Sequence, residues 1–104
     1  MRKEIIENII KLKKDNVKLA RAFIVQAKSS SPRNIGTEML ITENGGTFSS
    51  IGGGQDEKKV IEKAVDLIKQ DKSEKLKLTL TRKEAAEIGW VCGGQIDIFI
   101  QIIA

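Results

Sequence analysis

Residues 18–28, KLARAFIVQAK, place a nearly uninterrupted apolar run, Ala22–Phe23–Ile24–Val25, between charged ends. Such a short apolar run predicts a β-strand. Because the run does not alternate with polar residues, it predicts an inner strand that is covered on both faces.

The segments on either side of this strand predict a helix and a hairpin. Residues 3–14 carry isoleucines at helical spacing between charged residues, which predicts an amphipathic helix ending at Asp15–Asn16. After the strand, Asn44–Gly45 separates residues 38–42 from residues 47–51, and Asn-Gly between two such runs predicts a β-hairpin.

The second half of the chain predicts two more helices and two more strands. A helix is expected over residues 55–70, a half-exposed strand over 75–80 and a short helix over 81–88, opened by a capping box at Thr81 and Glu84. Alternating isoleucines over residues 95–103 predict a central strand. The expected fold is α+β: one small domain over residues 1–104, with helices packed on a mixed or antiparallel sheet.

Composition narrows the functional classes. The chain has 104 residues, of which 40% are hydrophobic and 31% charged, as in a folded soluble domain. It shows neither a secretory leader nor an apolar run of membrane-spanning length, so we expect a cytoplasmic protein without membrane contact. The net charge is +4, but with three Phe, one Trp and no Tyr the chain lacks stacking platforms, and no nucleic-acid partner is expected.

The cysteine and histidine content limits which disulfides, metal sites and catalytic groups the chain can have. One cysteine excludes an intramolecular disulfide, and the absence of histidine excludes the usual Cys/His zinc site and the commonest general base. We therefore expect no catalytic residues and a protein that is not a stand-alone enzyme.

Three short segments stand out as candidates for a ligand site. Ser29–Ser30–Ser31–Pro32–Arg33 offers hydroxyls and a guanidinium that suits phosphate or carboxylate, or it is a solvated turn. Gly52–Gly53–Gly54 enters a helix and is either an anion-binding turn or a tight packing turn. Cys92–Gly93–Gly94 holds either an accessible thiol or a small core residue.

Taken in order, these segments resemble the XdhC/CoxI family over residues 18–103. The residues that match the family pattern and carry the expected cofactor site are Ser30, Arg33, Gly52, Gly53, Gly54, Glu57, Cys92, Gly93 and Gly94. The resemblance implies an accessory protein that binds molybdenum cofactor (molybdopterin) as transient cargo and assists its sulfuration or insertion into a molybdenum hydroxylase such as xanthine dehydrogenase. Cys92 would lie near the molybdenum or its sulfur.

The resemblance also implies partners. These are the apo molybdenum hydroxylase, a sulfur-donating cysteine desulfurase, a separate dinucleotide-binding-type domain of the kind that longer members carry, and a second copy of the chain in a homodimer. Many members have a cysteine after the glycine run, where this chain has Gln55, which leaves only Cys92 as a thiol. The alternative is a small, non-catalytic interaction module that assembles with a partner chain.

Overall fold

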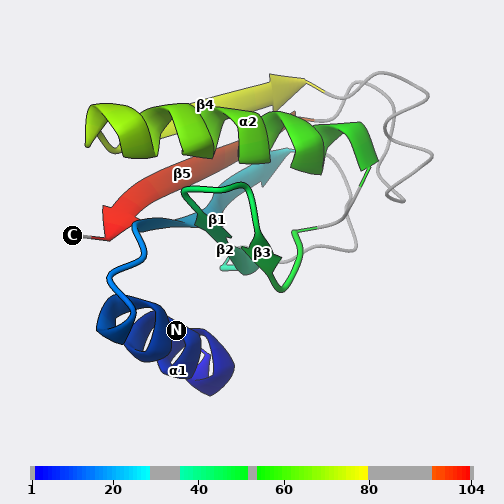
Figure 1. Cartoon of the computed structure of the whole chain (residues 1–104). Coiled ribbons are helices and arrows are strands. Elements are labelled where there is room, and N and C mark those ends of the chain that lie inside the picture. Colours follow the sequence, from blue (N-terminus) through cyan, green and yellow to red (C-terminus); the bar gives the residue numbers. More distant parts are fainter. Residues whose placement is uncertain (1, 29–35, 52–53, 80–94, 104) are drawn as a thin grey trace.

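A single sheet organises the chain (Figure 1). The computed structural model describes residues 2–28, 36–51, 54–79 and 95–103. Within them the elements follow in the order α1 (Lys3–Lys14), β1 (Leu19–Lys28), β2 (Glu38–Thr42), β3 (Thr47–Phe48), α2 (Gly54–Gln70), β4 (Glu74–Thr79) and β5 (Gln95–Ile103). All paired strands are antiparallel, and their order across the sheet is β3-β2-β1-β5-β4.

The main core lies between α2 and one face of the sheet. In a strand, successive side chains point to opposite faces, so the alternate residues of β1, β2 and β5 share this face. The buried residues that pack here come from α2 and from these strands; they include Ala20, Ala22, Ile24, Met39, Ile41, Val60, Ala64, Leu67, Ile98 and Ile100. The small alanines of β1 allow the helix to approach the central strand closely.

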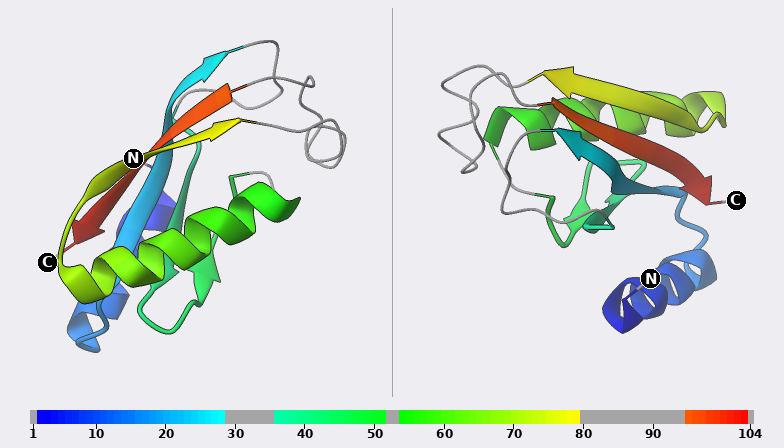
Figure 2. Two further views of the ribbon diagram at one scale, coloured as in Figure 1. Left: turned by 90° about the horizontal axis from the view of Figure 1, so that it is seen from above. Right: turned by 180° about the vertical axis from the view of Figure 1, so that it is seen from behind.

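Helix α1 lies on the opposite face of the sheet and covers only one end of it (Figure 2). Its buried residue Ile5 packs with Leu19 of β1 and Leu40 of β2, and Ile9 and Leu12 lie at the margin of this small cluster. Farther along the same face, Phe23 and Phe99 stay half-buried, with ring centroids 5.8 Å apart.

The structure confirms the α+β class and most of the predicted elements. The sheet is entirely antiparallel, and β5 lies inside it, as the alternating isoleucines predicted. β1 is central, but the prediction that both of its faces are covered is wrong in part, because α1 does not reach Phe23 and Val25, which remain half-buried. β3 is shorter than predicted and ends at Phe48. The helix expected over residues 81–88 falls outside the described residues.

Candidate functional site

Three strand ends meet in one row at one end of the sheet. Gln95, the first residue of β5, pairs with Lys28, the last residue of β1, and with Thr79, the last residue of β4. Neighbouring strands lie about 4.8 Å apart, so the backbones of Lys28 and Thr79 are separated by roughly 10 Å. The sequence segments between residues 28 and 36 and between residues 79 and 95 therefore start or finish at this row.

The start of α2 lies at the same end (Figure 1). A short turn at Asp71 joins the end of α2 to the start of β4, so the two elements run antiparallel and the first turn of α2 lies toward the end of β4. Before α2, Ile51 is 4% exposed and packs in the main core, which anchors the chain just ahead of the glycine run. The tertiary structure thus brings the boundaries of all three predicted site segments to one end of the sheet.

Most of the predicted site residues themselves lie outside the described residues. These are Ser30, Arg33, Gly52, Gly53, Cys92, Gly93 and Gly94. Gly54 and Glu57 are described, and both belong to the first turns of α2.

Glu57 turns back toward the chain that precedes the helix. Its Oε1 accepts hydrogen bonds from the hydroxyl of Ser50 and from the backbone N–H of Ile51, the latter at 3.2 Å. A carboxylate in this position satisfies backbone donors before the helix and is favoured by the helix dipole. Glu57 therefore fixes the chain entering the glycine run, and its contact with a cofactor stays a prediction.

A second carboxylate near the row was not singled out from the sequence. Asp97 lies two residues into β5, is 4% exposed, and its Oδ2 lies 3.7 Å from Nζ of the half-exposed Lys75 on β4. An aspartate inside the otherwise apolar run of β5 was the available signal, because a buried carboxylate requires a partner. Asp97 lies on the α1 side of the sheet near this end, next to Lys75.

Glu38 is the most buried carboxylate among the described residues and was also missed. It is 1% exposed, and its Oε2 accepts a hydrogen bond from Nε of Arg21 at 2.5 Å. Its Oε1 accepts a second hydrogen bond from the backbone N–H of Arg2 at 3.0 Å, just before α1. Burial alone would raise the pKa of Glu38, but the hydrogen bonds from Arg2 and Arg21 outweigh it and hold the pKa below its ordinary value. This cluster ties α1 to the sheet.

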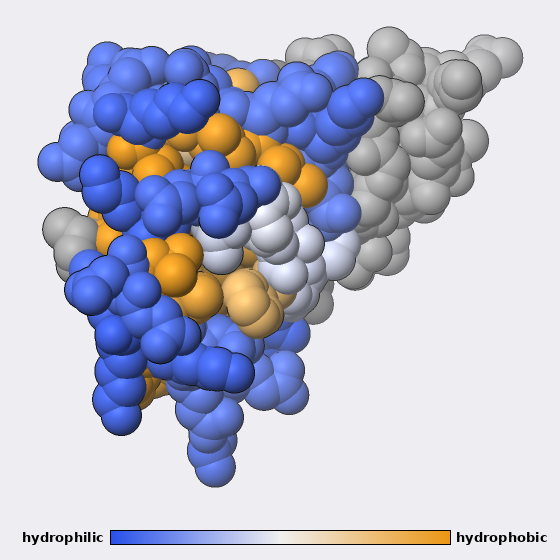
Figure 3. Space-filling model, in the orientation of Figure 1, coloured by the Kyte–Doolittle hydropathy of each residue, from blue (hydrophilic) through white to orange (hydrophobic). Residues whose placement is uncertain are grey.

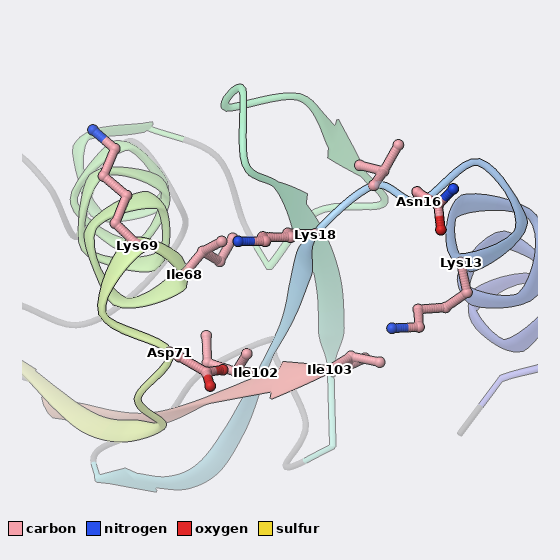
Figure 4. A pocket seen from close by; sticks show the side chains of 9 residues that line it. Lys13, Asn16, Lys18, Ile68, Lys69, Asp71, Ile102 and Ile103 are labelled. Atoms are coloured by element: carbon pink, nitrogen blue, oxygen red, sulfur yellow. The ribbon is translucent and has the colours of Figure 1, made fainter.

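A cleft of about 420 Å³ opens at the other end of the sheet, between the C-terminal ends of α1 and α2 (Figure 4). Lys13 and Lys18 extend into it from α1 and from the start of β1, whereas Lys69 points away. Both helices direct the negative ends of their dipoles here, so the lysines complement the helix termini. The cleft lies at the opposite end of the sheet from the row of Lys28, Thr79 and Gln95, so it is separate from the predicted cofactor site.

Two general observations concern possible metal and membrane contacts. Among the described residues, no three His, Cys, Asp or Glu side chains lie close enough together to hold a metal ion. Within the same residues, neither helix has the length and apolar character needed to span a bilayer.

Comparison with known proteins identifies the family. The model of the XdhC and CoxI family matches residues 12–81, which include β1 to β4 and α2. The chain therefore belongs to the XdhC and CoxI family, as the residues of its three predicted site segments indicated.

Two individual proteins extend this comparison. The uncharacterized protein YqeB of Escherichia coli K12 is 34% identical over 92 residues, which are 88% of this chain and 17% of YqeB. A crystal structure described as a xanthine dehydrogenase from Bacillus halodurans superimposes with a TM-score of 0.74 at 22% identity, over 95% of this chain and 30% of that one. At this identity the second likeness supports the fold. The chain spans less than a third of the length of either protein.

Proposed function

We propose that the chain is an accessory protein that binds molybdenum cofactor as cargo and assists its sulfuration or insertion into a molybdenum hydroxylase. Membership of the XdhC and CoxI family is the observation that carries this proposal, because it relates the chain to the maturation of xanthine dehydrogenase-type enzymes. The role is one of binding and transfer rather than of stand-alone catalysis.

The arrangement of the described residues supports a site at the end of the sheet where α2 begins. Lys28, Thr79 and Gln95 form one backbone row there, and α2 begins at the same end. Helix N-termini carry free backbone N–H groups and a favourable potential for anions, such as the phosphate of a pterin cofactor. A site of this kind draws on several chain segments that only the fold brings together.

Three of the predicted residues have side chains with a specific chemical role in this proposal. Arg33 would pair with the phosphate, since its guanidinium matches phosphate oxygens in two-point contacts. Cys92 would approach the metal or its sulfur ligand, for which a thiolate is a suitable soft partner. Glu57 would act as a positioning residue, since it already holds Ser50 and Ile51 ahead of α2.

Equilibrium binding of isolated molybdenum cofactor to the purified chain tests the proposal. We expect saturable binding that weakens by about 10-fold or more in Arg33→Ala and in Cys92→Ala, because each change removes a direct ligand contact. Lys72→Ala, at an exposed position ahead of β4 and at the end of that strand opposite to Thr79, serves as the matched control and should bind as the parent does.

Glu57→Gln separates positioning from direct contact. The amide keeps an acceptor for Ser50 and Ile51, so this variant should retain most of the binding, whereas Glu57→Ala should lose more. Absence of cofactor binding by a correctly folded chain, or equal binding by the parent, Arg33→Ala and Cys92→Ala, would contradict the proposed site.

A further inference from the structure

An apolar groove runs between α1 and the last residues of β5. It encloses about 420 Å³ and is lined by Ile6, Ile9, Ile10, Gln101, Ile102 and Ile103. Ile6 and Ile10 are 43% and 54% exposed, and they are the only exposed large hydrophobic side chains among the described residues. The groove lies at the Ile103 end of β5, roughly 26 Å along the strand from Gln95 and the predicted cofactor site.

The two isoleucines lie outside the cluster through which α1 packs on the sheet. Ile5, Ile9 and Leu12 belong to the stripe that packs against the sheet. Ile6 and Ile10 are four residues apart and form a separate stripe beside it. An apolar stripe that the fold leaves uncovered next to a groove is typical of an interaction surface.

The charged residues around the groove indicate the charge of a partner that would bind there. The cleft at the helix ends shares Ile102 and Ile103 with the groove, so the apolar surface continues directly into a region in which Lys13 and Lys18 outnumber one carboxylate, Asp71. At the other end of the stripe, Lys3 precedes Ile6 by three residues, and its ammonium lies 3.9 Å from the carboxylate of Glu7. Figure 3 shows apolar side chains at the surface between α2 and α1, bordered by hydrophilic ones.

We propose that this groove is a docking site for an acidic amphipathic segment of another protein. Large aliphatic side chains of that segment would fill the space beside Ile6 and Ile10, and its carboxylates would form ion pairs with Lys13 and Lys18. Burial of the apolar side chains supplies the affinity, while the opposite charges select the partner and accelerate the encounter.

The same charges argue against a second copy of the chain at this surface. Lys3, Ile6, Ile10 and Lys13 follow one another along one side of α1 at spacings of three and four residues. Two such helices packed antiparallel, with Ile6 against Ile10, would bring Lys3 of each opposite Lys13 of the other. A partner with the opposite charge avoids this repulsion.

A synthetic helical peptide provides the probe. It is about 14 residues long, with leucine at positions i, i+3, i+4 and i+7 and glutamate between them. Binding is measured by fluorescence anisotropy and mapped by amide chemical shifts of the labelled chain. We expect saturable binding, with shifts concentrated in α1 and at residues 101–103 of β5.

Variants of the chain separate the apolar from the charged contribution. Ile10→Ser should weaken binding by about 10-fold or more, because it removes a contacting apolar side chain. Lys13→Glu should also weaken it, whereas Lys77→Glu, the same charge change at a distant exposed position on β4, should not. A peptide with lysine in place of glutamate should not bind.

Several results would overturn the proposal. These are equal binding of the acidic and basic peptides, shifts located outside the groove, and full binding by Ile10→Ser. Sedimentation and vesicle experiments address the other occupants: an α1-dependent dimer that Ile10→Ser dissociates, or Ile10-dependent adsorption to phosphatidylglycerol vesicles without peptide binding, would assign the surface to a second copy or to a membrane instead. None of these outcomes depends on cofactor binding, so the two proposals can fail separately.

Discussion

Glu38 should be among the most sensitive positions for stability. Glu38→Ala removes the acceptor of the Arg21 guanidinium, whose side chain is 14% exposed, and of the Arg2 amide. Leaving a buried charge without its partner costs about 3–5 kcal/mol. Arg21 keeps some solvent contact and lies over the ring of Phe23 at 4.0 Å, so the lower limit of about 3 kcal/mol applies.

Comparison of several variants isolates the ion pair from the burial of the side chain. Glu38→Gln keeps an acceptor but loses the charge, so it should cost about 1.5 kcal/mol. The double variant Arg21→Met/Glu38→Leu should recover much of the stability lost in Glu38→Ala, because no unpaired charge remains. The exposed pair of Lys63 and Glu74, 3.1 Å apart, provides the control, and its coupling should be several times weaker.

The assay is urea unfolding followed by far-UV circular dichroism, with the midpoint and slope compared between variants. Because the folded-state pKa of Glu38 lies below its unfolded value, the stabilisation is fully present above the unfolded pKa and is lost as the pH falls through the folded pKa. The difference between the parent and Glu38→Gln should therefore shrink on acidification below about pH 4. A loss under about 1 kcal/mol in Glu38→Ala, or a difference that is independent of pH, would refute the reasoning.

Three further predictions concern the core, the exposed side of α1 and the hairpin. Leu67 is 1% exposed beneath α2, so Leu67→Ala opens a cavity there and should lower the free energy of unfolding, measured in urea, by about 2–5 kcal/mol. Ile10 is 54% exposed, so Ile10→Ser should change the free energy of unfolding by less than about 0.5 kcal/mol. If Ile10→Ser instead unfolded the chain, α1 would be packed differently. Gly45→Ala should cost about 1 kcal/mol, because Gly45 has φ +84° in the hairpin turn. Thermal unfolding equal to that of the parent would contradict this backbone conformation.

The helix α1 and the hairpin could be predicted from the sequence because each depends on residues that are close together in the chain. The isoleucine spacing predicted α1 and Asp15–Asn16 predicted its end, while Asn44–Gly45 predicted the hairpin between β2 and β3. The glycine, serine and cysteine motifs led to the family that the comparison then identified. These features depend on residues close together in the chain, where periodicity and turn chemistry are reliable guides.

Burial was harder to predict, as β1 illustrates. The apolar residues Phe23 and Val25 indicated a strand covered on both sides, yet α1 leaves them half-buried. The sequence of β1 does not indicate how far along the sheet α1 extends. That extent is set by the Leu19 and Leu40 contacts of α1 and by the bonds that Arg2 makes to Glu38, residues widely separated in sequence.

The sequence by itself therefore determined the two described helices, most of the extent of the strands and the family, because each follows from periodicity, turn chemistry or motifs along the chain. Only the tertiary structure decided which surfaces those elements share. Antiparallel pairing brought Lys28, Thr79 and Gln95 into one row, and packing of α1 on the sheet left Ile6 and Ile10 beside a groove. Both depend on contacts between residues far apart in the chain, and a linear pattern carries no direct record of such contacts.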